Sequence, residues 1–251
     1  MNYRISIPSF KRENQLKDKT LKLLEEIPNS IIDIFIENEI EHQRYKEVNP
    51  EYNYIITNTT GVKEKRNYIR KYYRFQTKET NILSIDDDIE AIQKGECLID
   101  DLNEFFSDAF ELTKKKGYNY WGVCCFDNPY FLKDNISTNL KYICGGLNGL
   151  IIDRKKDLLQ TTYNHYEDFH FSILHFIRDG GVVRFNNYCV KTKIMTPGGI
   201  VASYGGLENR KKDMEDAGIK FVNEYPKMAR LIKKKRGYDL RLNHRAKPQQ
   251  I

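Results

Sequence analysis

Segments of strand length alternate with segments of helical periodicity over the first 85 residues of this 251-residue chain. Short apolar runs that predict strands occur at residues 3–7, 31–36, 52–57 and 81–85. The intervals between them carry helix-like patterns, at residues 12–27, 39–47 and 61–75. Such alternation is typical of a parallel sheet with covering helices. We therefore predict an α/β fold with a central, mostly parallel sheet flanked by helices.

The composition indicates a folded, globular chain. Hydrophobic residues make up 40% of the sequence and aromatic residues 12%, which is more apolar than disordered chains are. No apolar run approaches the length of about 18 residues that a membrane span needs, and the first residues do not resemble a signal peptide. The five cysteines form no CxxC pair and no zinc-like spacing. We therefore expect reduced thiols, no membrane partner and a cytoplasmic location.

Cationic side chains are concentrated near the C-terminus, although the net charge of the chain is only +6. These cations are Lys233, Lys234, Lys235, Arg236, Arg241, Arg245 and Lys247. Such a block is usually solvated, and it also suits a polyanion such as nucleic acid, a nucleotide diphosphate or an acidic membrane. We divide the chain into a main domain over residues 1–225 and a basic C-terminal extension over residues 226–251.

Three consecutive aspartates, Asp86, Asp87 and Asp88, follow the strand-like run at residues 81–85. Adjacent carboxylates repel one another and are costly near a core unless a cation compensates them. Mg²⁺ and Mn²⁺ prefer oxygen ligands and accept phosphate as a co-ligand. Ligands of α/β sheets bind beyond the carboxyl ends of the strands. The triplet is therefore a candidate metal–phosphate site, and the alternative is a solvated acidic turn.

A second acidic pair, Glu167-Asp168, opens a predicted helix at residues 167–179. Acids at a helix N-terminus are favoured by the helix dipole and by free amides, so helix capping explains the pair equally well. The functional alternative is a general base, because a carboxylate in a partly dry cleft can accept a proton from an attacking hydroxyl.

Three further segments carry candidate binding groups. Cys144-Gly145-Gly146 is either a turn or a place where backbone amides approach a ligand closely. Residues 61–67 begin a cationic helix that suits a phosphate or a ribose, or that is simply solvated. Residues 241–245 place a histidine between two arginines, a surface pattern that can also hold a metal and a phosphate. The sequence contains no GxxxxGK[ST], GxGxxG or GxSxG motif, which disfavours P-loop, dinucleotide-binding and α/β-hydrolase proteins.

In this order, the motifs resemble those of a nucleotide-sugar glycosyltransferase of the GT-A fold. The chain resembles the TET/JBP-associated DNA glycosyltransferase group, which is similar to the base J glucosyltransferase and related phage enzymes. The similarity spans residues 3–245. The residues that carry it are Ile7-Pro8-Ser9-Phe10-Lys11-Arg12, Gly61-Val62 with Lys65-Arg66-Asn67, Ser84-Ile85-Asp86-Asp87-Asp88-Ile89, Trp121-Gly122-Val123, Cys144-Gly145-Gly146 and Tyr166-Glu167-Asp168-Phe169.

The resemblance implies a single Rossmann-like, nucleotide-sugar-binding domain with a mixed, mostly parallel sheet. It also implies metal-dependent transfer of a sugar, from a UDP-linked donor, to the hydroxyl of a hydroxymethylpyrimidine in DNA. Single-stranded DNA, or duplex DNA with a flipped base, would be the acceptor. We expect inversion at the anomeric carbon, a phage-type modification in the host cytoplasm, and an extension that closes the active site or contacts DNA.

The resemblance also assigns roles to individual residues. The metal, Mn²⁺ or Mg²⁺, would be bound by Asp88, Asp86 and His244. Asp168 is the preferred base and Glu167 the second choice. The nucleotide sugar would contact Pro8, Ser9, Arg12, Arg66, Asn67, Asp86, Asp87, Gly145, Gly146, Arg241 and Arg245.

Three alternatives remain open at this stage. The first is a GT-A glycosyltransferase with a glycan, lipid or protein acceptor, and the second is a nucleic-acid-binding protein without catalysis. The third is a two-metal nuclease or nucleotidyltransferase. The sequence leaves open the donor sugar, the modified base, the stereochemistry and the oligomeric state.

Overall fold

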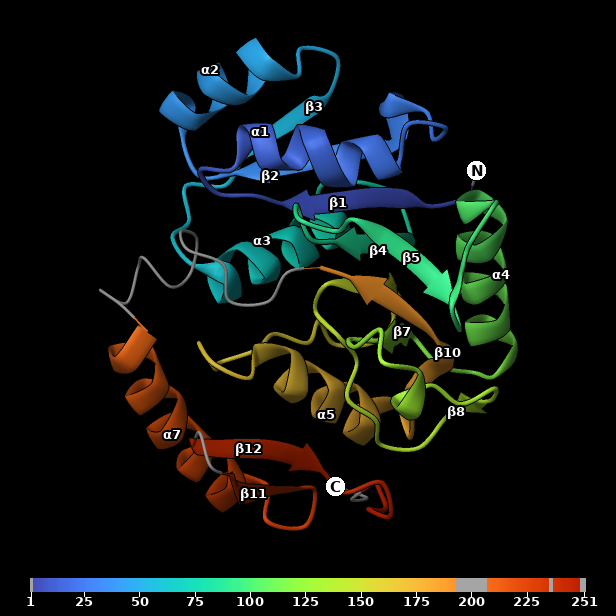
Figure 1. The fold of residues 1–251 in the computed structure, drawn as a ribbon, viewed down its shortest axis with the longest axis vertical. Coiled ribbons are helices and arrows are strands. Elements are labelled where there is room, and N and C mark those ends of the chain that lie inside the picture. Colours follow the sequence, from blue (N-terminus) through green and yellow to red (C-terminus); the bar gives the residue numbers. More distant parts are fainter. Residues whose placement is uncertain (1, 193–206, 235–236, 249–251) are drawn as a thin grey trace.

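The structure, a computed structural model, describes residues 2–192, 207–234 and 237–248. In these residues, ten strands form one sheet, and a separate hairpin lies at the far end of the long axis from α2 (Figure 1). No helix in the described ranges combines the length and apolar character needed to cross a lipid bilayer.

The N-terminal half is the predicted parallel sheet. Its strands are β1 (Arg4–Pro8), β2 (Ile32–Ile36), β3 (Asn53–Ile56) and β4 (Asn81–Ile85). They lie in the order β3-β2-β1-β4, and every neighbouring pair is parallel. The connections contain α1 (Glu13–Leu16), which continues as the π-helix η1 (Lys17–Leu21), the 3₁₀ turn η2 (Asn29–Ile31), α2 (Glu39–Val48) and α3 (Val62–Phe75).

The second half makes the sheet mixed. Its central strands are β9 (Leu147–Ile151), β7 (Tyr120–Cys124) and β10 (Val183–Lys191). Strand β9 runs antiparallel to β4 and β7, while β10 is parallel to β7. The short strands β5 (Ala91–Lys94), β6 (Cys97–Leu98) and β8 (Ile136–Ser137) add antiparallel edges. The prediction of a mixed, mostly parallel sheet flanked by helices is therefore confirmed.

Both faces of the sheet are covered by helices. Successive residues of a strand point to opposite faces, so neighbouring residues pack against different helices. In β2, Ile34 belongs to the large cluster that also contains residues of α1, α2 and α4 (Leu102–Lys115). Phe35, the next residue, packs instead with Ile69 of α3. On that second face, Phe171 of α5 (Glu167–Asp179) packs against Tyr120 of β7.

Some short elements lie outside the predicted segments. Residues 128–139 contain β8 and the 3₁₀ turn η3 (Pro129–Phe131). The C-terminal elements have no counterpart in the prediction. They are α7 (Leu207–Glu224), β11 (Ala229–Lys234) and β12 (Gly237–Leu242).

The β11–β12 hairpin is built into a second hydrophobic cluster. Leu240 and Leu242 pack there with Phe221 of α7 and with Ile173 and Phe176 of α5. Residues on both sides of position 226 therefore share one core. The division into a domain and an extension remains a prediction.

Candidate active site

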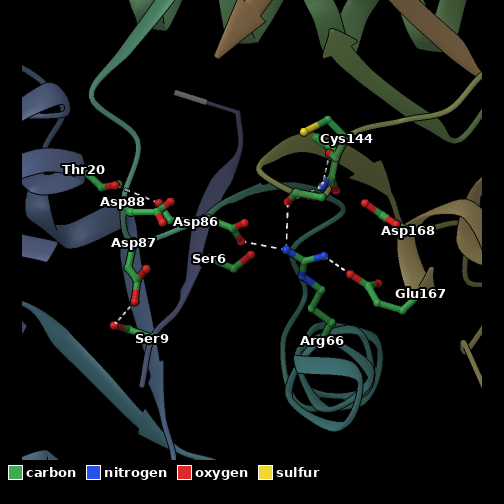
Figure 2. Close-up of polar contacts among 12 residues, drawn as sticks. Ser6, Ser9, Thr20, Arg66, Asp86, Asp87, Asp88, Cys144, Glu167 and Asp168 are labelled. Carbon is green, nitrogen blue, oxygen red and sulfur yellow. Dashed lines mark hydrogen bonds and ion pairs between the residues drawn. The ribbon is translucent and has the colours of Figure 1, made fainter. Parts of the chain in front are cut away.

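The aspartate turn is held beside the end of β1. Because β1 and β4 are parallel neighbours, with Ser6 opposite Ser84, the residues that follow both strands lie side by side. The hydroxyl of Ser9 donates to Asp87 Oδ2 over 2.6 Å (Figure 2). The hydroxyl of Thr20 donates to the backbone oxygen of Asp86 over 2.7 Å and accepts from the backbone amide of Ile89 over 3.0 Å. These contacts fix the backbone of the turn.

The three aspartates have different surroundings. Asp87 is 5% exposed, and burial raises the pKa of its carboxyl to about 6 although Arg12 opposes the shift. The side chains of Asp86 and Asp88 are 32% and 16% exposed. Arg12 Nη1 lies 3.0 Å from Asp87 and 3.2 Å from Asp88. Asp87 thus anchors the turn, and Asp86 and Asp88 remain accessible to a ligand.

The cations of α3 are buried on its inner face. Lys65, Arg66 and Arg70 are 4%, 9% and 8% exposed. Lys65 Nζ donates to the backbone oxygen of Ser9, and the Arg70 guanidinium lies 3.5 Å above the ring of Phe171. Of the two possibilities for this helix, the structure therefore excludes simple solvation for these three side chains.

Arg66 connects the two acidic motifs. Its Nη2 donates to Asp86 Oδ1 over 2.7 Å and to the backbone oxygen of Gly145 over 3.1 Å. Its Nη1 forms an ion pair with Glu167 at the start of α5. Figure 2 shows this guanidinium lying between the two carboxylates. A Cβ atom at Gly145 would overlap the guanidinium, so glycine is needed there for the close approach of Arg66.

The two acids of the second motif are held differently. Glu167 is 7% exposed, and its Oε2 has no hydrogen-bond partner among the described residues. Asp168 is partly exposed; its Oδ2 accepts from the Tyr142 hydroxyl over 2.6 Å and its Oδ1 from the Phe169 amide over 2.9 Å. Burial raises the pKa of both carboxyls, and in Asp168 the Tyr142 hydrogen bond opposes that rise.

A small cavity lies between the sheet, α3 and α5. It measures about 30 Å³, and Arg66, Glu167 and Asp168 are part of its lining. This is the volume of about one water molecule. A sugar or nucleotide is much larger and does not fit this cavity.

Several other predicted residues lie in or near this site. Pro8 ends β1, and the backbone oxygen of Gly146 accepts from the Asp86 amide over 3.0 Å. The side chain of Asn67 donates to the backbone oxygen of Thr161 over 2.8 Å. Asn67 thereby ties α3 to the segment that leads into α5.

The structure does not bring the predicted C-terminal residues to the aspartate turn. His244 Nδ1 lies 2.9 Å from the backbone oxygen of Leu140, and Arg241 Nε lies 3.6 Å from Asp239. Arg245 is exposed. No contact within the described ranges joins these residues to Asp86 or Asp88, so their metal and donor roles remain predictions.

Sequence reasoning missed three residues that shape the site. Thr20 holds the aspartate turn from within a π-helical segment, a local geometry that often accompanies functional sites. Tyr45 binds the Ser9 hydroxyl over 2.6 Å, and Tyr142 binds Asp168. Only the spacing of Tyr142, two residues before the Cys144-Gly145-Gly146 motif, offered a signal.

The accessible carboxylates fit a divalent cation. Mg²⁺ and Mn²⁺ prefer oxygen donors. Burial and the negative charge of Asp86 raise the pKa of the Asp88 carboxyl, although Arg12 opposes the shift. Among the described residues no group of three or more histidine, cysteine, aspartate or glutamate side chains could hold a metal. Mg²⁺ sites commonly use one or two carboxylates and complete the shell with water and substrate phosphate. Asp86 and Asp88 match that arrangement.

No protein-family model matches the sequence, and a search of curated proteins finds no significant match. Solved structures do match. Glucosyl-3-phosphoglycerate synthase from Mycobacterium tuberculosis, in complex with Mn²⁺, uridine diphosphate and glucosyl-3-phosphoglycerate, is 8% identical, with a TM-score of 0.57 and coverage of 97% of this chain and 87% of that one.

Two further structures are similar. The mannosyltransferase PcManGT from Pyrobaculum calidifontis, in complex with GDP-Man and Mn²⁺, is 9% identical, with a TM-score of 0.52 and coverage of 88% of this chain. S. aureus TarS 1-349 in complex with UDP is 11% identical, with a TM-score of 0.50 and coverage of 89%. The chain spans 64% of the mannosyltransferase and 66% of TarS 1-349. At these identities the likeness shows the fold, which is the GT-A fold of nucleotide-sugar glycosyltransferases.

Proposed function

We propose that the chain is a metal-dependent glycosyltransferase that moves a sugar from a UDP-linked nucleotide sugar to the hydroxyl of a hydroxymethylpyrimidine in DNA, as in phage-type DNA modification. One observation carries this proposal. Arg66 joins Asp86, at the end of β4, to Glu167, beside Asp168. A diphosphate bound at the aspartates would therefore lie next to a carboxylate that can act as a base.

The leaving-group side is formed by Asp86, Asp88 and Arg12. A divalent cation bound to the two aspartates would supply positive charge that stabilises the departing diphosphate. Arg12 lies 3.2 Å from Asp88 and adds a second positive charge on the same side. Ser9 and Thr20 keep the turn rigid, so these groups need little rearrangement when negative charge develops.

The attacking side is formed by Asp168. It is more exposed than Glu167, whose charge is already paired with Arg66. Asp168 accepts the hydroxyl proton while the acceptor oxygen bonds to the anomeric carbon and the bond from that carbon to the diphosphate oxygen breaks. If the base lies opposite the leaving group, the anomeric configuration inverts. Glu167 then serves to hold Arg66 in place.

The complexes of similar proteins support the donor and the metal. The named partners are UDP with Mn²⁺ in the mycobacterial synthase and GDP-Man with Mn²⁺ in the mannosyltransferase. Because these two proteins are only 8% and 9% identical to this chain, their similarity supports its fold more strongly than its substrate.

The DNA acceptor is supported by the motif resemblance and by the cationic residues 226–251. We propose that this segment contacts DNA or closes the active site, and that the reaction takes place in the cytoplasm of a host cell. A duplex hides its base edges, so the target base must be flipped out or lie in a single strand.

A nucleoside-product screen tests the proposal. The protein is incubated with a panel of UDP-sugars, Mn²⁺ and hydroxymethylated DNA in single- and double-stranded form, and the digested nucleosides are analysed by mass spectrometry. We expect one hexosyl or pentosyl nucleoside, and much less of it over the same time with Asp168→Asn.

The outcomes of this screen are separable. Transfer to a glycan or protein, with none to DNA, would remove the DNA acceptor and keep the enzyme class. Plasmid nicking with Mg²⁺ alone, without any sugar transfer, would instead indicate a nuclease.

A further inference from the structure

The β11–β12 hairpin has one apolar face and one cationic face. Its register pairs Ala229 with Leu242 and Leu231 with Leu240, and these residues pack into the cluster shared with α5 and α7. The intervening residues point to the other side, because side chains alternate along a strand. The outer face therefore carries Arg230, Ile232, Lys234, Asp239 and Arg241.

Two arginines on the outer face oppose each other directly. The register pairs Arg230 with Arg241, and like charges directly opposite are destabilising. Asp239 is the only acid on this face in the described part of the hairpin, and it is shared by Lys234 at 2.7 Å and Arg241 at 3.6 Å. No ion pair involves Arg230 within the described ranges. A fold that keeps two exposed arginines in this position has positive charge available for an external anion.

Two other regions that contain cations are less suited to a polyanion. Lys65, Arg66 and Arg70 of α3 are buried. The large groove of about 1450 Å³ beside α4 is lined by many acids, Asp100, Asp101, Glu104, Asp108, Glu111 and Asp134, against three lysines. Repulsion from these carboxylates disfavours an approaching phosphate backbone.

The hairpin adjoins the segment that carries Glu167 and Asp168. A Cβ atom at Gly218 of α7 would lie 2.9 Å from Leu231 of β11 and 3.5 Å from Tyr166. Tyr166 directly precedes Glu167. Burial raises the pKa of Tyr166, and the nearby negative charge of Asp239 adds to that rise. The inner face of the hairpin thus lies close to the segment that leads into α5 and Asp168.

We infer that the outer face of the β11–β12 hairpin is a binding surface for the phosphate backbone of nucleic acid, with Arg230 and Arg241 as its main contacts. This inference rests on the proposed function for the identity of the polymer as the DNA acceptor. The hairpin orients the DNA, and Asp168 acts on the base that reaches the site. A two-stranded ribbon is also narrow enough for the major groove, which is about 12 Å wide.

Duplex binding by fluorescence anisotropy tests the inference. A labelled, unmodified duplex is titrated with wild type, with Arg230→Gln/Arg241→Gln, and with Arg230→Glu/Arg241→Glu over a range of KCl concentrations. We expect the Gln pair to lower the affinity about tenfold or more and to reduce the salt slope by about 2, because two phosphate contacts are lost. The Glu pair should lower it further.

The matched control is Lys114→Gln/Lys115→Gln, which removes the same charge from the exposed end of α4. Its affinity for the duplex should stay within about threefold of wild type. Circular dichroism of each variant checks that the fold is retained. Equal losses in the control, or unchanged binding in the arginine variants, would overturn the inference.

Binding of UDP with Mn²⁺, measured by calorimetry on the same variants, separates a role in DNA binding from a role in donor binding. Loss of UDP binding with unchanged duplex affinity would place the two arginines on the donor and contradict the inference. Loss of duplex affinity in a protein that transfers no sugar to DNA would keep the binding surface and refute the proposed acceptor.

Discussion

Arg66 is the residue at which the two acidic motifs meet. Its buried guanidinium contacts Asp86, Glu167 and the backbone of Gly145. The buried charge is stabilised only while these partners remain in place, since removal of one member of a buried pair typically costs about 3–5 kcal/mol. The aspartate turn and the start of α5 are therefore coupled through one side chain.

Gly145→Ala tests that coupling. The new Cβ atom would overlap the Arg66 guanidinium, so we expect the free energy of unfolding to fall by about 3 kcal/mol or more. Gly146→Ala is the matched control, because the nearest atom to its Cβ lies 3.5 Å away; its effect should stay within about 1 kcal/mol. Urea denaturation measures both. Equal stability of the two variants would contradict the close approach of Arg66 to Gly145.

Tyr142→Phe tests how Asp168 is positioned. The Tyr142 hydroxyl donates to Asp168 and opposes the rise in the pKa of that carboxyl. A base must be deprotonated, so activity declines as the pH falls through its pKa. Loss of the hydrogen bond should move the acid limb of kcat/KM to higher pH and lower kcat about 10- to 100-fold, with little change in the KM for the donor.

The control for this experiment is Tyr130→Phe, since Tyr130 is 78% exposed on the turn η3. Its pH profile should match wild type. A Tyr142→Phe enzyme with reduced activity but an unshifted acid limb would indicate a purely structural role for this hydroxyl.

At the scale of elements, α5 begins with Glu167 and Asp168 and also carries two buried histidines. His175 is 1% exposed, and its ring lies 2.9 Å from Asp179 and stacks on Tyr120. Burial lowers the pKa of His175 to about 4. In the unfolded chain the pKa is about 6.5, so the unfolded state binds more protons between these two pH values.

Stability should therefore fall as the pH is lowered from about 6.5 to 4. From the difference in pKa, His175 contributes on the order of 3 kcal/mol to this loss. We expect His175→Gln to flatten the dependence of unfolding free energy on pH in this window, compared with wild type. His42→Gln, on the surface helix α2, is the control. Parallel pH curves for wild type and His175→Gln would refute the assignment.

The elements with clear boundary signals were predictable from sequence. Strand β4 and helix α5 have the predicted bounds, because an apolar run ends in charge in one case and an acidic turn begins a periodic segment in the other. Strand β10 continues through Asn186, whose side-chain amide donates to Asn135 and Ser137 over 2.7 Å each and is thereby satisfied inside the sheet.

The site was predictable in its acids but not in its cations. A strand end and a helix start locate Asp86–Asp88 and Glu167-Asp168 by local pattern alone. The burial of Lys65 and Arg66 depends on residues that are distant in sequence, namely Ser9 for the first and Glu167 for the second. Without knowledge of these distant contacts, the sequence does not distinguish a helix with buried cations from one whose cations are solvated.

At the scale of the whole molecule, the C-terminal hairpin is part of the core. Met228, Ala229, Leu240 and Leu242 are each at most 6% exposed. Burial of a large apolar side chain contributes about 1.5–3 kcal/mol, and whole domains are stable by only about 5–15 kcal/mol. Deletion of residues 226–251 should therefore unfold or aggregate the protein, as judged by circular dichroism and gel filtration.

Leu240→Ala gives a milder version of the same test. We expect a loss of about 2–5 kcal/mol in unfolding free energy. Ile219→Ala, at a position that is 47% exposed on α7, is the control and should change little. A truncated chain that remains folded and as stable as wild type would show that residues 226–251 are a separable extension.

In the proposed mechanism, the aspartate turn binds the donor and Asp168 activates the acceptor within one site. The most direct test measures UDP binding with Mn²⁺ and the rate of sugar transfer for Asp88→Ala and Asp168→Asn. We expect Asp88→Ala to lose metal-dependent UDP binding. We expect Asp168→Asn to bind UDP within a few-fold of wild type but to transfer sugar about 10²- to 10⁴-fold more slowly. Wild-type UDP binding by Asp88→Ala, or wild-type transfer by Asp168→Asn, would contradict it.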